Sequence, residues 1–145
     1  MDQIERNILH SAYMKTIFVF GDGQNSFEVS PLEVNQSFLK FLHDSGILSW
    51  AVITSDNPFS KPLSVEKNNE RRKNLEIELL ENGYKLLPAL GRDPEGQLDP
   101  EYGYFLHNLS LKDALKIGKD YGQNAILFGE ETAKSKIVWV EPETT

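Results

Sequence analysis

The pattern of hydrophobic positions along the chain predicts seven β-strands. Short runs of β-branched and aromatic residues, bounded by turn residues, are typical of strands. The nearly continuous apolar run at 47–54 (ILSWAVIT) indicates a central strand covered on both faces. Pro88 has no amide donor, which predicts an edge strand, a bulge or a strand end at that position. The predicted strands are residues 15–20, 27–29, 47–54, 84–90, 102–107, 125–128 and 136–140.

Three helices are predicted between these strands from their start and stop signals. Ser30 precedes a proline suited to the first helical position, and Glu33 stands where a capping box needs it. Ser64 and Ser110 can cap the other two helices. Each predicted helix is followed by a glycine that can end it: Gly46, Gly83 and Gly122.

The order of these elements is β-β-α-β-α-β-β-α-β-β, so hairpins alternate with single helices. A doubly wound fold would instead repeat β-α strictly. We therefore expect an α+β fold: one domain over residues 14–140, with a mixed β-sheet and about three helices packed mainly on one face. Residues 1–13 are expected to form either a short helix or a fraying extension, and residues 141–145 a loose tail. Trp50 and Trp139 are predicted to lie in the core.

Composition supports a globular domain and removes several classes of site. The chain has 145 residues, of which 39% are hydrophobic and 26% charged, as in ordinary globular proteins. It contains no cysteine, which excludes disulfides, zinc–thiolate sites and thiol nucleophiles. The three histidines, His10, His43 and His107, lack metal-ligand spacing. We therefore expect no metal and no cofactor.

Charge and hydropathy bear on partners and location. The net charge is −7, and the basic cluster at 71–73 is interleaved with glutamates, so a nucleic-acid partner is not expected. No apolar run approaches the ~20 residues of a membrane span, and the first ten residues lack the apolar core of a signal peptide. We therefore expect a cytoplasmic protein that does not bind membranes.

Polar residues gather where the central strand ends. Thr54 and Asn57 follow the strand, and ligands often bind beyond strand ends, although Asp56-Asn57-Pro58 also suits a simple turn. In the next helix Asn68 shares a face with leucines, and Arg71 lies on the edge of that face. This pair either ties down the loop before the helix or presents an amide and a guanidinium to a ligand.

Three further segments supply candidate residues. Arg92 lies in a Gly/Pro loop and either contacts a ligand or forms an internal ion pair. Gln123 and Asn124 stand before a strand and either bind a ligand or complete a helix C-cap. Glu101 is the one acidic residue considered as a general base.

The segments that carry these residues resemble an uncharacterised bacterial family, domain-of-unknown-function family 3293. The likeness rests on ITSDNPFSKPLS at 53–64, GRDPEG at 91–96 and YGQNAILFG at 121–129, and it extends over about 12–129. It implies a small bacterial cytosolic domain without an established activity. The chain departs from the family pattern at Ser55-Asp56 and at Gly103, where a serine commonly follows the glutamate. No role for that serine can be carried over.

Two functional hypotheses remain. The first is a domain that binds a small polar or anionic ligand, with or without catalysis, between the Asn57 corner, the Asn68/Arg71 pair and the Arg92 loop. The second is a protein-interaction or regulatory module whose polar residues hold its loops in place. The first is favoured, because polar residues at the ends of several elements are costly to keep without a partner.

Overall fold

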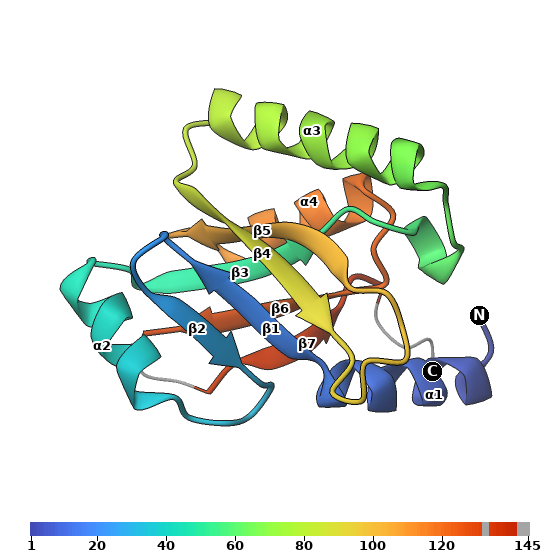
Figure 1. Cartoon of the computed structure of the whole chain (residues 1–145), viewed down its shortest axis with the longest axis horizontal. Coiled ribbons are helices and arrows are strands. Elements are labelled where there is room, and N and C mark those ends of the chain that lie inside the picture. The colour runs from blue at the N-terminus through green and yellow to red at the C-terminus, as the bar shows by residue number, and fades with distance from the viewer. Residues whose placement is uncertain (132–133, 142–145) are drawn as a thin grey trace.

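The computed structural model describes residues 1–131 and 134–141, and seven strands in it form a single curled sheet (Figure 1). The order across the sheet is β2-β1-β4-β5-β3-β6-β7, and every neighbouring pair is antiparallel. The expected mixed sheet is therefore wrong: three hairpins supply antiparallel pairs, and β3 runs opposite to both of its neighbours. The strands are β1 (Ile17–Gly21), β2 (Ser26–Val29), β3 (Ser49–Thr54), β4 (Leu86–Arg92), β5 (Glu101–His107), β6 (Ala125–Glu130) and β7 (Lys136–Trp139).

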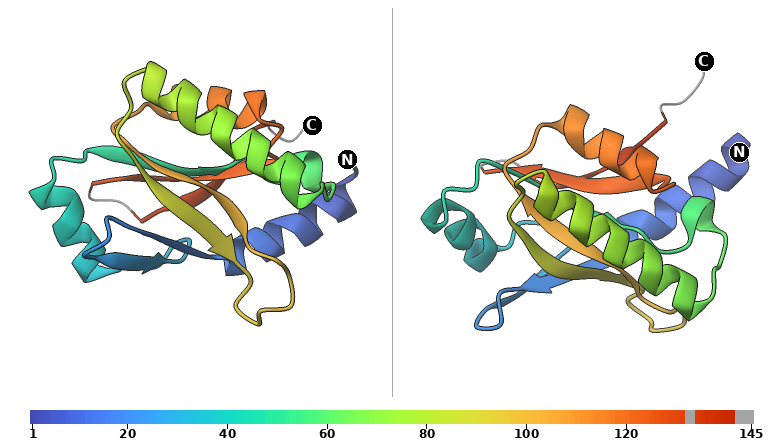
Figure 2. Two further views of the ribbon diagram at one scale, coloured as in Figure 1. Left: turned by 45° about the horizontal axis from the view of Figure 1, so that its top comes forward. Right: turned by 90° about the horizontal axis from the view of Figure 1, so that it is seen from above.

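Four α-helices in the described residues surround the sheet, one more than the three predicted between the strands. They are α1 (Gln3–Lys15), α2 (Gln36–Asp44), α3 (Val65–Glu81) and α4 (Leu111–Asp120). Helices α3 and α4 lie side by side over one face, α2 covers the other face, and α1 lies against β7 (Figure 2). Helices thus cover both faces rather than mainly one. None of the helices in the described part of the chain is long and apolar enough to cross a membrane.

The core has two halves, one on each face of the sheet, because successive strand residues point to opposite faces. On the α2 side, Phe20 and Phe105 stack with ring centres 4.4 Å apart, and Trp50 packs among them. On the other side, Leu75 and Leu79 of α3 pack against the sheet. Strand β3 contributes to both halves, which confirms it as a central strand.

Two of the three predicted helix starts are confirmed. The hydroxyls of Ser64 and Ser110 accept the backbone N–H groups of Lys67 and Asp113, at 3.2 and 3.0 Å. The third prediction is wrong, because α2 begins after Asn35 rather than after Ser30.

The side chain of Asn35 explains the later start of α2. Its Oδ1 accepts the N–H of Phe38 at 3.1 Å, while its Nδ2 donates to the carbonyl of Glu28 at 3.0 Å. Leu32 takes a left-handed conformation (φ 66°) that no helix continues through. The tertiary anchor to β2 thus overrides the local Ser-Pro-Leu-Glu signal.

Trp50 is buried as predicted, with 1% of its surface exposed, but Trp139 is only half-buried. Helix α1, rather than the sheet, covers Trp139: its Nε1 contacts His10 Nδ1 at 3.1 Å, and the Arg6 guanidinium lies 4.2 Å from its ring centre. The helix alternative for the N-terminal segment is therefore the correct one. The predicted loose tail falls on 142–145, outside the described residues, apart from Glu141.

Pro88 lies in β4, an interior strand, so the edge-strand alternative is wrong. The pairing of β4 with β1 ends at Ala89, directly beside Pro88. The proline therefore stands where the ladder to β1 stops, but it is the third residue of β4 and pairs with Tyr104 of β5, so the strand-end alternative does not hold for the strand itself.

Candidate functional site

The predicted site centres on the segment that follows β3, residues 55–63, called the corner below. Its backbone is held in an uncommon conformation: Asn57, Phe59 and Ser60 all have positive φ, at 49°, 56° and 61°. Such conformations persist only where the surroundings determine them, and they concentrate at functional sites. The corner lies where β5 begins and where α3 begins, beside the end of α4.

Asn57 and Asn68 hold the corner against α3. The N–H of Asn57 donates to Asn68 Oδ1 at 3.0 Å, and Asn68 Nδ2 donates to Asn57 Oδ1 at 2.9 Å. The same Asn57 oxygen accepts the N–H of Leu63 at 3.0 Å, which closes the corner on itself. Both amides are thus engaged within the protein, as the loop-staple alternative predicted.

Arg71 and Gln123 secure the other side of the corner. Arg71 Nε donates to the carbonyl of Ser55 at 2.8 Å, and its Nη2 donates to the carbonyl of Tyr121. Gln123 Nε2 donates to the carbonyl of Asp56 at 3.2 Å, while its Oε1 accepts the hydroxyl of Thr54 at 2.8 Å. These side chains satisfy buried backbone carbonyls that the irregular corner leaves without ladder partners.

Asn124 ties the end of the corner to α1. Its Nδ2 donates to the hydroxyls of Ser60 at 2.9 Å and of Tyr13 at 3.2 Å. The long-range contact with Tyr13 was not predicted, because nothing in the sequence indicates that the first helix packs here.

A buried carboxylate lies inside the corner and was not among the predicted site residues. Asp56 accepts the N–H of Tyr102 at 2.8 Å and pairs with Arg72 Nη2 at 3.4 Å. The Arg72 guanidinium also lies 4.4 Å from the ring centre of Tyr102, which is partly exposed. The sequence does place Asp56 and Arg72 next to predicted site residues, because Arg72 follows Asn68 by one helical turn and Asp56 directly precedes Asn57.

Glu101 lies beside this group at the start of β5. Asn57 Nδ2 donates to its Oε1 at 3.4 Å. Burial raises the pKa of Glu101 to about 6; the Asn57 hydrogen bond opposes this rise and the nearby Asp56 charge adds to it. A carboxyl with a pKa near the working pH can exchange a proton with a bound molecule. The general-base hypothesis for Glu101 requires such a pKa.

Arg92 does not join the corner. It ends β4 in register with Ile17 of β1, and its Nη2 reaches across to Glu28 of β2 at 3.1 Å. Arg92 thus forms an internal ion pair with Glu28, which is the second of the two alternatives predicted for it. The predicted residues that the structure brings together are Thr54, Asn57, Asn68, Arg71, Glu101, Gln123 and Asn124.

Two hollows of the surface lie away from the corner. One, of about 160 Å³, lies between α2, β3 and the segment before β7, and the other, open and about 500 Å³, lies beside the start of α4. Neither is lined by the predicted site residues. Within residues 1–131 and 134–141, no three His, Cys, Asp or Glu side chains are grouped as metal ligands would be.

Comparison with known proteins places the corner within a family. The model of the family described as "Protein of unknown function (DUF3293)" matches residues 53–126, about half of the chain, from the end of β3 to the start of β6. No curated protein and no solved structure gives a significant match. The match takes in α3, β5, α4 and the corner, and it confirms the family that the sequence resembles. The chain belongs to the DUF3293 family of proteins of unknown function.

Proposed function

We propose that the domain binds a small polar molecule at the corner, against the carboxyl of Glu101. The observation that carries this proposal is the environment of that carboxyl. It is half-buried, and within the described residues it has one hydrogen bond, a long one of 3.4 Å from Asn57. A partly desolvated carboxyl with a single long protein hydrogen bond and a raised pKa, at a strand end, is a candidate for ligand contact.

The charges at the corner favour a neutral polar ligand over an anionic one. Arg71 donates to two backbone carbonyls, and Arg72 pairs with Asp56, so the charge of each guanidinium is already met within the protein, although Arg72 Nε has no hydrogen-bond partner among the described residues. An anion would approach the carboxylates of Glu101 and Asp56, and these two guanidinium groups are not free to offset their charges. A molecule that donates an N–H or O–H to Glu101 meets no such cost.

Glu101 gives the site its chemical character. At neutral pH most copies of this carboxyl are ionised, because its pKa is about 6, and they can accept a hydrogen bond or a proton from the ligand. Any catalysis at this site would use Glu101 as the general base. From the family resemblance we also propose that the protein is bacterial and cytosolic.

A ligand-observed NMR screen tests this proposal. The probes are neutral amides, nucleosides and polyols, measured at pH 7.5 with the unaltered protein and with Glu101→Gln. Losing a hydrogen bond to a charged acceptor should weaken a true hit about tenfold or more. Glu95→Gln, in an exposed loop, is the matched control and should change nothing. Absence of any hit, or hits that Glu101→Gln leaves unchanged, would count against the site.

A second candidate function is a protein-interaction module, and the side chain of Phe59 supports it. This phenylalanine is 64% exposed on the corner, and its left-handed backbone is fixed by an N–H bond to the Gly122 carbonyl at 2.7 Å. A large apolar side chain held in this way suits an interface anchor. Partner binding that Phe59→Ser removes and Glu101→Gln leaves intact would favour this candidate over ligand binding.

A further inference from the structure

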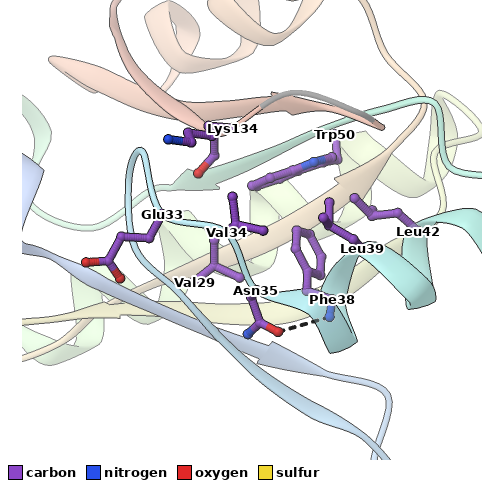
Figure 3. Close-up of a pocket in the computed structure, with 10 residues that line it drawn as sticks. Val29, Glu33, Val34, Asn35, Phe38, Leu39, Leu42, Trp50 and Lys134 are labelled. Carbon is purple, nitrogen blue, oxygen red and sulfur yellow. Dashed lines mark hydrogen bonds between the residues drawn. The ribbon is translucent and has the colours of Figure 1, made fainter.

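The two hollows of the surface differ in character. The smaller one is walled in part by core side chains that are 1–3% exposed, Phe38, Leu42 and Trp50, so it belongs to the packing on the α2 side of the sheet (Figure 3). The larger one, about 500 Å³ and open, includes an exposed leucine in its lining: Leu48 keeps 64% of its surface accessible. The larger hollow is therefore the one that has room for a side chain of another molecule.

The lining of the larger hollow comes from the ends of three strands and from the start of α4. Ser49 of β3 is in register with Glu130 at the end of β6, and Phe128 of β6 is in register with Lys136 at the start of β7. Paired residues share a face and alternate residues return to it, so these four side chains lie on the face of the sheet that α4 covers. With Leu111 of α4 they line the larger hollow. The hollow thus combines an apolar lining with two charged groups.

Leu48 is held in place by its backbone. Its N–H donates to Asn108 Oδ1 at 2.8 Å, and its carbonyl accepts the N–H of Glu131 at 2.9 Å. Asn108 has a left-handed φ of 53°, and it also donates to the carbonyls of Gly46, from Nδ2 at 3.3 Å, and of Ser49, from its N–H at 2.7 Å. The backbone is therefore fixed on both sides of the exposed leucine. A large apolar side chain on a fixed backbone suits an interface anchor, because little conformational freedom is lost on binding.

The two charged groups of the larger hollow are exposed and opposite in sign. Glu130 and Lys136 stand diagonally across the β6–β7 pair, because Lys136 is in register with Phe128, two residues before Glu130. Neither forms an ion pair within the part of the chain that the structure describes. A second copy related by a two-fold axis presents the same two charges in the reverse order. Each glutamate can then meet the lysine of the other copy.

We infer that the larger hollow is the interface of a symmetric dimer, and that its occupant is a second copy of this chain. Leu48 of each copy enters the hollow of the other beside Phe128 and Leu111, and Glu130 pairs with Lys136 of the partner subunit. A two-fold interface must be self-complementary, and here the anchor, the hollow and both charges lie on one patch. The hollow lies at the start of β3 and the corner at its end, so the inference does not depend on the proposed function.

Sedimentation equilibrium of the full chain over a range of concentrations tests the inference. The unaltered protein should form dimers as its concentration rises. Leu48→Asp should weaken the association by about a hundredfold or more, because each interface would then bury two unpaired carboxylates. Leu98→Asp is the matched control: it changes a leucine that is 71% exposed in the loop between β4 and β5, and it should leave the association unchanged. Both leucines are exposed, so neither change removes a core contact.

Charge reversal tests how the two copies are oriented. Glu130→Lys and Lys136→Glu each set like charges against one another at two symmetric places, so each should weaken the association about tenfold. Glu130→Lys also reduces the net negative charge of the chain, so general repulsion between copies predicts the opposite direction for this variant. The double variant restores both ion pairs and should recover most of the original affinity.

Three outcomes would overturn the dimer. A protein that stays monomeric up to about 1 mM would leave the larger hollow for a different partner or for solvent. A dimer that Leu48→Asp leaves unchanged would place the interface on another surface. Charge reversals without effect, or a double variant that associates no better than the single variants, would contradict the pairing of Glu130 with Lys136 of the partner subunit.

Discussion

Asn57 and Asn68, eleven residues apart, form a reciprocal hydrogen-bonded pair across the corner. The backbone N–H of Asn57 donates to Asn68 Oδ1 at 3.0 Å, and Asn68 Nδ2 donates to Asn57 Oδ1 at 2.9 Å. One amide thus satisfies both a backbone donor and a side-chain acceptor of a residue with left-handed φ. The pair links the first turns of α3 to the end of β3, and it gives Asn68 a structural role that can be measured.

Replacing Asn68 with leucine should destabilise the fold. The change extends the apolar stripe of Leu75 and Leu79, but it leaves the Asn57 N–H without its partner in a half-buried place. We expect a loss of about 1–3 kcal/mol in the free energy of unfolding, measured by chemical denaturation at unchanged denaturant slope. Asn69→Leu, on the exposed side of the same helix, is the control and should cost less than about 0.5 kcal/mol. A neutral or stabilising Asn68→Leu would instead show that this amide is solvated in the free protein.

The left-handed backbone of Asn57 leads to a second prediction. Alanine and glycine both remove the side-chain bonds, but only alanine resists a φ of 49°. Asn57→Ala should therefore be less stable than Asn57→Gly by about 1 kcal/mol in urea denaturation. The order should reverse at Asn69 within α3, where glycine is the poorer residue by a similar amount. Equal stabilities at position 57 would mean that the corner relaxes out of its left-handed conformation.

The features that the sequence predicts well depend on local chemistry. Ser64 and Ser110 each accept an N–H three residues ahead, so their capping role is visible in the sequence alone. The same reasoning failed at Ser30, because Asn35 gains a bond to the Glu28 carbonyl of β2 and the backbone N–H of Leu32 donates to the carbonyl of Ser135 at 2.8 Å. The second of these contacts joins segments about 100 residues apart, which no local pattern reveals.

The candidate site shows the same division between local and long-range information. Asn57, Asn68 and Arg71 converge because a corner and the helix directly after it must meet. Arg92 does not join them, since its position depends on β4 pairing with β1, a contact between segments about 70 residues apart. Asp56 and its partner Arg72 were not among the predicted site residues: the spacing of Arg72 from Asn68 is visible in the sequence, but the burial of Asp56 beside a turn is not.

Gly103, one of the two departures from the family pattern, leads to a third prediction. A Cβ atom there would lie 2.0 Å from the carbonyl oxygen of Ile53 and 2.4 Å from Thr54 Cα, both of them backbone atoms that cannot move aside. Gly103→Ser should therefore cost on the order of 3 kcal/mol or prevent folding. Gly96→Ala, at a loop position with open space and a φ of 67°, should cost only about 1 kcal/mol. Thermal unfolding of both variants makes the comparison, and a Gly103→Ser protein as stable as the original would show that β3 and β5 separate locally without cost.

The raised pKa of Glu101 predicts that its neutral isostere stabilises the protein, and only above a certain pH. The folded pKa, about 6, lies above the ordinary value of 4.5, so the folded state holds this proton more tightly than the unfolded state does. The contribution of the Glu101 carboxyl to the free energy of unfolding is therefore fully present below about pH 4.5 and is lost as the pH rises through 6. At ~1.4 kcal/mol for each pH unit, Glu101→Gln should raise the free energy of unfolding by about 2 kcal/mol at pH 7.5 and by almost nothing at pH 4.

Urea denaturation of both proteins between pH 4 and 8 measures the difference, and titrations common to both, such as that of His107, cancel in it. Glu95→Gln, in the exposed loop, should show no such pH dependence. A stabilisation at neutral pH together with weaker ligand binding would identify Glu101 as a residue kept for function at the expense of stability. A Glu101→Gln protein that is less stable than the original at pH 7.5 would mean that the carboxylate is needed to hold Asn57 and the corner in place.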